Sequence, residues 1–140
     1  MIETKVRYYK KMFLSGAVFN WCAALLFFFA FEDMYIFMGG DAVPQAPLFN
    51  LFLQLISSLV FLFGGIYYAI SQDPDSYASR QLAIVGAAGK LLFFSFFTAY
   101  AISGHIPMAL VALVSVDFIY AILFFEYIRY QAWSSKQSNI

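Results

Sequence analysis

The chain has 140 residues, of which 63% are hydrophobic and only 11% are charged, and its formal net charge is zero. Soluble domains carry about 25% charged residues, and a soluble fold of this length has too little interior to hide so much apolar side chain. The composition therefore excludes an ordinary soluble domain, and the absence of net positive charge gives no support for nucleic-acid binding. It predicts an integral membrane protein whose main partner is the lipid bilayer.

Four apolar stretches are long enough to cross a bilayer, which takes about 20 helical residues. The first follows a basic start with Lys5, Arg7, Lys10 and Lys11. Its apolar run is too long for a signal peptide, so we expect a spanning helix instead. We predict an all-α, four-helix transmembrane bundle that forms a single domain over residues 1–140, with spans at about 12–31, 48–70, 82–103 and 106–128.

The connections between these stretches differ in length and polarity. Residues 32–47 are acidic and contain Gly39-Gly40, Pro44 and Pro47, so we expect a loop there. Asp73-Pro74 has the composition of an N-cap and a first helical residue, and predicts the start of the third helix. The link at 104–105 is so short that the last two spans must form an antiparallel hairpin.

Basic residues outside the spans predict the orientation. The N-terminal segment has four, the 71–81 loop has Arg80, and the tail has Arg129 and Lys136. With four spans, these segments fall on one side, which the positive-inside rule assigns to the cytoplasm. We therefore expect N-in/C-in topology, with the acidic loop and His105 outside. One histidine and three dispersed carboxylates do not define a metal site, so metal binding there stays open.

An intramembrane polar layer is the most informative feature of the sequence. Lys90 lies near the middle of the third span, and an ammonium in hydrocarbon needs a partner or a route to water. Counted from the same side of the membrane, Asp117 and Asn20 lie at about the same depth, at roughly 1.5 Å per residue. We expect the three side chains to meet. They could form a structural staple or line a ligand or ion path, or Lys90 could instead extend towards the interface.

Other candidate residues are less specific. Small residues predict close helix packing in the second and third spans, at Gly64, Gly65, Gly86 and Gly89. Polar contacts in the outer half of the membrane are expected from Gln54, Ser57, Ser58, Ser95 and Tyr100. Clusters of phenylalanine could line a site for a lipid, a quinone or a carotenoid, although lipid-facing and core packing explain them as well. No catalytic triad, carboxylate dyad or cysteine-based metal motif is present in the sequence, so no catalytic or metal-binding residue is assigned.

Several short motifs between residues 48 and 128 resemble a family. They are Gly64-Gly65-x-Tyr67, Asp73-Pro74, Arg80, Gly86-x-x-Gly89-Lys90, Gly104-x-x-Pro107 and Asp117. The pattern is similar to small uncharacterised bacterial four-helix membrane proteins, and more distantly to the DoxX-type family. The resemblance implies a four-helix unit in the bacterial inner membrane and a loose association with membrane redox systems. It brings no assigned catalytic or cofactor residue.

The sequence favours a non-enzymatic membrane component. Four spans enclose little interior, so we expect a homo-oligomer or an accessory subunit of a larger membrane complex, which binds a partner or a hydrophobic ligand between helices. The alternative is a small ion- or proton-coupled transporter or channel that uses Lys90 and Asp117. A membrane enzyme lacks a recognisable catalytic set.

Overall fold

Four long helices form the part of the chain that the computed structural model describes, residues 3–137. They are α1 (Glu3–Phe37), α2 (Pro47–Gln72), α3 (Tyr77–Ile102) and α4 (Ala109–Gln137). Each contains a stretch that is long and apolar enough to cross a membrane. The predicted all-α, four-helix bundle of a multi-pass membrane protein is therefore confirmed.

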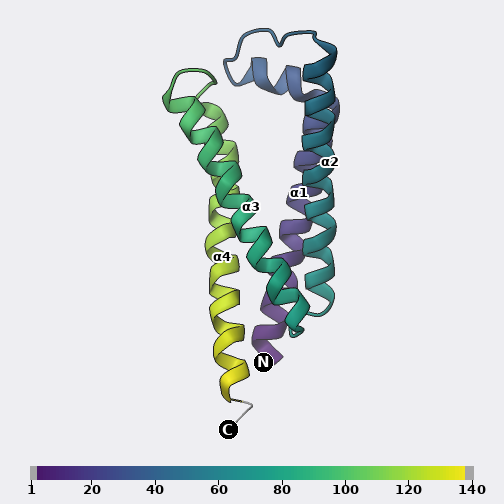
Figure 1. Ribbon diagram of the computed structural model, residues 1–140, viewed down its shortest axis with the longest axis vertical. Helices are drawn as coiled ribbons and strands as arrows, with labels where there is room; N and C mark the ends of the chain where they lie inside the picture. The colour runs from purple at the N-terminus through teal and green to yellow at the C-terminus, as the bar shows by residue number, and fades with distance from the viewer. Residues whose placement is uncertain (1–2, 138–140) are drawn as a thin grey trace.

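The helices are arranged as two antiparallel hairpins, α1–α2 and α3–α4 (Figure 1). Both termini and the α2–α3 connection lie at one end of the molecule, here called the terminal end. The hairpins meet there and diverge towards the opposite, distal end. Helices pack closely within each hairpin, whereas contacts between hairpins are fewer. The backbones of the two hairpins therefore form a wedge that is narrowest at the terminal end.

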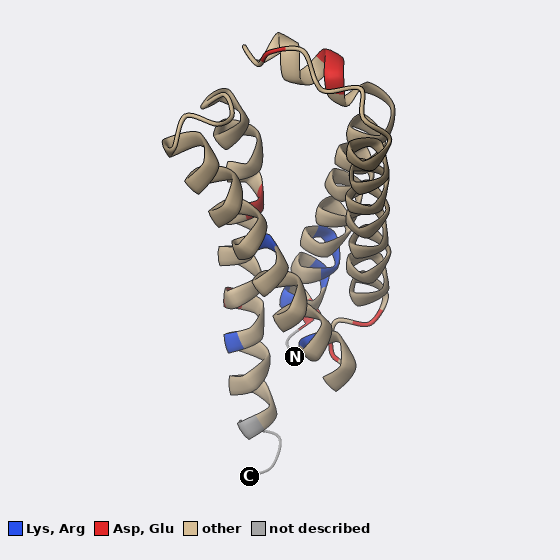
Figure 2. Cartoon of the chain, turned by 45° about the horizontal axis from the view of Figure 1, so that its top comes forward, with Lys and Arg blue, Asp and Glu red and all other residues tan. Residues whose placement is uncertain are grey.

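Lysines and arginines concentrate towards the terminal end, while acidic residues occur at both ends (Figure 2). The basic start of α1, Arg80 near the start of α3 and Arg129 near the end of α4 all belong to the terminal end. The side chain of Lys136, which also entered the orientation prediction, lies outside the described residues. The basic segments therefore share one side of the bundle, as the positive-inside rule expects of the cytoplasmic side. The assignment of that side to the cytoplasm stays a prediction.

The first helix is longer than predicted. Residues 32–37, expected to belong to a loop, continue α1 beyond a kink at Ala30, where φ is −139° and ψ is 26°. The segment after the kink turns across the distal end (Figure 1). The helix ends only where Gly39 takes a φ of +90°, and Gly40 N–H then donates to the Tyr35 carbonyl (2.9 Å). Glycine adopts this left-handed conformation without a Cβ penalty, so it sets the end of the helix.

The start of the third helix also differs from the prediction. Asp73 follows the last residue of α2, and the N-cap of α3 is Ser76, whose Oγ accepts a hydrogen bond from Ser79 N–H (3.1 Å). The Asp73 carbonyl accepts a further bond from Ser79 Oγ (2.6 Å). Serine satisfies the free N–H groups of the first turn as well as aspartate does, so residue type alone could not choose between two candidate caps three residues apart.

An aromatic core joins the two hairpins at the terminal end. Phe13 of α1 stacks on Phe124 of α4, with ring centroids 4.7 Å apart, and meets Tyr127 edge-on at 4.9 Å. Tyr67 of α2 meets Phe124 edge-on at 4.9 Å. These four side chains, together with Tyr9, are almost completely buried. We refer to the five residues as the terminal core.

Hydrogen bonds reinforce this junction. The Pro74 carbonyl, in the α2–α3 connection, accepts from Tyr127 OH (2.6 Å) and from Gln131 Nε2 (3.1 Å), both on α4. On α1, Tyr9 OH donates to Glu126 Oε1 of α4 (2.9 Å). Helix α4 is therefore fixed both to α1 and to the connection between the hairpins.

Two of the predicted packing glycines lie where a side chain would not fit. A Cβ added at Gly86 would lie 2.6 Å from Cε1 of Tyr67, and one at Gly64 would lie 2.5 Å from Cδ1 of Trp21. The Tyr67 hydroxyl also donates to the Gly86 carbonyl (3.4 Å). Small residues at these positions let α2 approach α1 and α3 closely.

The other two predicted packing glycines are less constrained. A Cβ at Gly89 would make ordinary contact with the Phe63 ring at 3.5 Å, and one at Gly65 would meet nothing within 4 Å. The prediction of close packing is thus wrong for Gly65, because this residue lies on the exposed side of α2.

Gly86→Ala is expected to lower the free energy of unfolding by about 1–3 kcal/mol, because the buried Tyr67 ring must move. The measurement is reversible unfolding of the detergent-solubilised protein, followed by helicity. Gly65→Ala is the matched control, and we expect it to be neutral or stabilising by about 0.5–1 kcal/mol, since alanine favours helix over glycine. Equal effects of the two substitutions would contradict the proposed fit.

Candidate functional site

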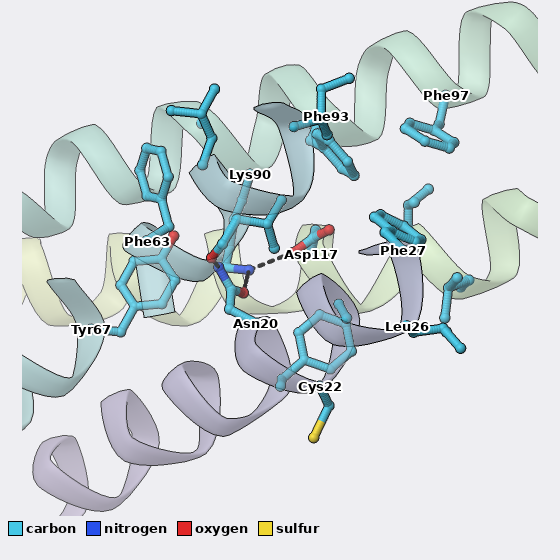
Figure 3. A pocket seen from close by; sticks show the side chains of 18 of the residues that line it. Asn20, Cys22, Leu26, Phe27, Phe63, Tyr67, Lys90, Phe93, Phe97 and Asp117 are labelled. Carbon is cyan, nitrogen blue, oxygen red and sulfur yellow. Dashed lines mark hydrogen bonds and ion pairs between the residues drawn. The ribbon is translucent and has the colours of Figure 1, made fainter. Parts of the chain in front are cut away.

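The three residues of the predicted polar layer meet between the hairpins. Lys90 Nζ forms an ion pair with Asp117 Oδ1 and donates a hydrogen bond to Asn20 Oδ1 (3.0 Å), as Figure 3 shows. The Lys90 side chain is only 4% exposed and that of Asp117 is 13% exposed. Lys90 therefore does not extend to the interface, which was one of the three sequence-based interpretations.

This polar cluster connects all four helices. Lys90 and Asp117 belong to the second hairpin, on α3 and α4, and Asn20 belongs to α1. The Asn20 amide in turn donates from Nδ2 to the Val60 carbonyl of α2 (3.3 Å). Both members of the ion pair thus belong to the same hairpin, and Asn20 links the pair to the other hairpin.

Aromatic rings surround the ammonium group. Lys90 Nζ lies 5.5 Å from the ring centroid of Phe19, 5.3 Å from that of Tyr67 and 5.2 Å from that of Tyr120. At these distances the ring faces attract a cation and replace part of its lost hydration. The sequence did not indicate that these rings lie around Lys90, because phenylalanine and tyrosine occur around the whole circumference of the helices.

A cavity of about 580 Å³ lies against the polar cluster, and all four helices line it. Its volume falls within the range of pockets for small molecules and cofactors, about 300–1,000 Å³. In Figure 3, Phe27, Phe93 and Phe97 lie on one side of the polar cluster, and Phe63 and Tyr67 lie on the other. Apart from the cluster, the lining is almost entirely apolar and rich in aromatic rings.

Packed side chains close both ends of this cavity. The terminal core lies on the side of the polar cluster that faces the terminal end. At the distal end, Met34, in the part of α1 beyond the kink, is buried in a cluster with Phe27 and Leu110. Phe97 and Leu113, which line the cavity, pack against the same cluster. The kink at Ala30 therefore places a short helical segment over the distal end of the cavity.

The cavity is not fully enclosed. Several lining residues are exposed, namely Cys22, Leu26, Ile56, Leu59 and Phe96. In a membrane-spanning bundle, the surroundings to which such apolar side chains are exposed would be acyl chains.

The cluster retains capacity for a further hydrogen-bonded group. An ammonium has three N–H donors, and those of Lys90 have two hydrogen-bond acceptors, Asn20 and Asp117. Among the described residues, no hydrogen-bond donor contacts Asp117 Oδ2. Both residues line the cavity, so this unused hydrogen-bonding capacity belongs to its wall.

The predicted polar residues of the outer half do not converge. Gln54, Ser58, Ser95 and Tyr100 are exposed, and none of them lines the cavity. Ser57 is buried, but its hydroxyl donates to the Leu53 carbonyl of its own helix (2.7 Å). Helix depth, on which the expectation of polar contacts rested, does not determine which way a side chain points.

The acidic loop and His105 do not form a metal site either. Across residues 3–137, no three histidine, cysteine, aspartate or glutamate side chains are grouped in a way that could hold a metal ion. His105 is exposed, and its ring lies 5.9 Å from that of Tyr100.

No protein-family model matches this chain, and neither a curated protein nor a solved structure matches it significantly. The resemblance to DoxX-type proteins therefore stays a prediction, and the cavity with its polar cluster is the main indication of function.

Proposed function

We propose that this protein binds a hydrophobic molecule from the lipid phase in the cavity between its two hairpins, with Lys90, Asp117 and Asn20 as the polar anchor. One observation supports this proposal above all. An apolar, ring-lined cavity of about 580 Å³ has a single hydrogen-bonding cluster on its wall. Pockets for small hydrophobic molecules have this composition, in which a few polar groups fix the orientation of the ligand.

The proposed role is binding rather than catalysis. Lys90 and Asp117 pair with each other, and neither forms a hydrogen bond with a nucleophilic side chain. An activated nucleophile needs such a contact with its base. We therefore propose a binding protein rather than an enzyme.

The cellular setting is part of the proposal. Basic residues at the terminal end support cytoplasmic termini, and the resemblance of residues 48–128 favours a bacterial inner membrane. We also propose self-association or membership of a larger membrane complex, because two hairpins with few mutual contacts enclose a small interior. Native mass spectrometry of gently extracted protein reports the bound molecule and the oligomeric state together.

Val114→Phe is expected to displace the bound molecule while the protein stays folded. Val114 is buried on α4 and lines the cavity, so a phenyl ring there occupies ligand space. We expect the retained hydrophobic molecule to fall by about tenfold, the equivalent of about 1.4 kcal/mol, as measured by native mass spectrometry. Ile119→Phe adds the same ring on the exposed side of α4 and should leave retention unchanged. Equal retention in both variants would contradict binding in this cavity.

A transporter is the second candidate function, because the charged pair borders the cavity. The packed terminal core opposes it, since transport requires a path through that end. Ion or proton flux into liposomes separates the two functions. We expect the wild type to show no more flux than Lys90→Met. Flux that the wild type supports and this variant abolishes would favour the transporter.

A further inference from the structure

We propose that the ligand is a flat, conjugated molecule with a neutral head group, whose ring carbonyl oxygen accepts a hydrogen bond from Lys90. This inference rests on the proposed function and adds the chemical class of the ligand. Three properties of the site support it, namely its net charge, its unused hydrogen-bonding groups and the aromatic character of its walls.

The net charge of the site favours a neutral head group. The ammonium of Lys90 is compensated by Asp117, and among the described residues no other acidic or basic side chain lines the cavity. An anionic head group would compete with Asp117 for Lys90 and leave one carboxylate without a counterion. A cationic head group would do the same to the ammonium. Either outcome places an unpaired charge in a medium of low dielectric constant, which is costly. A neutral carbonyl leaves the ion pair intact.

The remaining hydrogen-bonding groups favour a carbonyl. Lys90 has one N–H beyond those directed to Asn20 and Asp117, and a carbonyl oxygen is a good acceptor for it. A molecule with no polar atom would leave this donor unsatisfied in an apolar cavity. Such an unmet donor lowers affinity, because the ammonium then has less compensation for its lost water.

The walls favour a flat, conjugated ring. Phe63 and Tyr67 of α2 and Phe93 and Phe97 of α3 line the cavity near Lys90, and Figure 3 shows them on both sides of the ion pair. Aromatic side chains stack on planar ligands with a gain beyond that of buried area alone. A saturated acyl chain fills space without using these ring faces. Two membrane molecules share the required chemistry, an isoprenoid quinone and a keto-carotenoid.

The test compares probes that differ only in the head group, in bilayer nanodiscs. They are a benzoquinone with a decyl chain, decylbenzene, 4-decylbenzoate and decylpyridinium. We expect the wild type to bind the quinone about tenfold more tightly than decylbenzene, as one net hydrogen bond to a charged donor predicts. In Lys90→Met/Asp117→Leu, the preference for the quinone should disappear while binding of decylbenzene persists. Lys11→Met removes an exposed charge and should preserve the preference.

The outcomes separate this inference from the proposed function. Equal affinity of the wild type for the quinone and decylbenzene would overturn the inference and leave the function standing, as would tighter binding of the benzoate or the pyridinium. Failure of all four probes to bind would overturn the function itself. Native mass spectrometry and absorbance of the extracted protein then identify the source, since a keto-carotenoid absorbs visible light and an isoprenoid quinone absorbs in the ultraviolet. Retention of phospholipid alone would count against both the quinone and the keto-carotenoid and would overturn the inference.

Discussion

Asp117→Ala is expected to destabilise the protein by about 3–5 kcal/mol, the usual cost of leaving a buried charge without its partner. Lys90 is 4% exposed, and without the carboxylate its ammonium keeps only the Asn20 oxygen and three ring faces. The measurement is the free energy of unfolding in mixed micelles, by titration with a denaturing detergent.

The double variant Lys90→Met/Asp117→Leu tests the cause of this loss. It replaces both charged side chains with apolar ones of similar size. We therefore expect its free energy of unfolding to be higher than that of Asp117→Ala and close to that of the wild type. A single variant as stable as the wild type would show that the ion pair contributes nothing. A double variant as unstable as the single one would assign the loss to packing instead.

Phe13→Ala is expected to lower the free energy of unfolding by about 2–3 kcal/mol. The Phe13 ring is fully buried in the terminal core and stacks on Phe124 of the other hairpin. Truncation leaves a void and removes these contacts. The loss should fall at or just below the lower end of the range for Phe→Ala truncations, about 3–5 kcal/mol, because in a micelle the separated helices still have apolar surroundings.

Phe29→Ala provides the control on the same helix. Phe29 is 77% exposed and faces the surroundings of the bundle, so its truncation should change stability by less than about 0.5 kcal/mol. The unfolding titration described for Asp117→Ala serves both variants. Similar losses for Phe13→Ala and Phe29→Ala would contradict the role of the terminal core in joining the hairpins.

The number of helices and the polar cluster could be predicted from the sequence because both follow from the cost of polar groups in hydrocarbon. Length and hydropathy identify the spans, and an ammonium at mid-depth requires a counterion. Asp117 was the only carboxylate deep inside another apolar stretch, since Glu126 lies only two residues from the end of its span, and depth counting placed Asp117 level with Lys90 and Asn20. The ion pair in the structure agrees with that count.

The cavity could not be predicted, because it depends on the angle between the hairpins. The hairpins meet at the terminal core, whose members resemble the many other aromatic residues in the chain. The kink at Ala30 could not be predicted either, because neither Ala30 nor its neighbours Phe29 and Phe31 is a proline or a glycine. These two features enclose the site, so the sequence indicated its polar residues without indicating the space beside them.

The placement of both charges on one hairpin has a consequence for biosynthesis. Because Lys90 and Asp117 lie on α3 and α4, which a short turn connects, they can pair as soon as those two helices leave the insertion machinery. The second hairpin then enters lipid without a bare ammonium and does not depend on the first for its counterion. Only the bond to Asn20 must wait until the two halves dock.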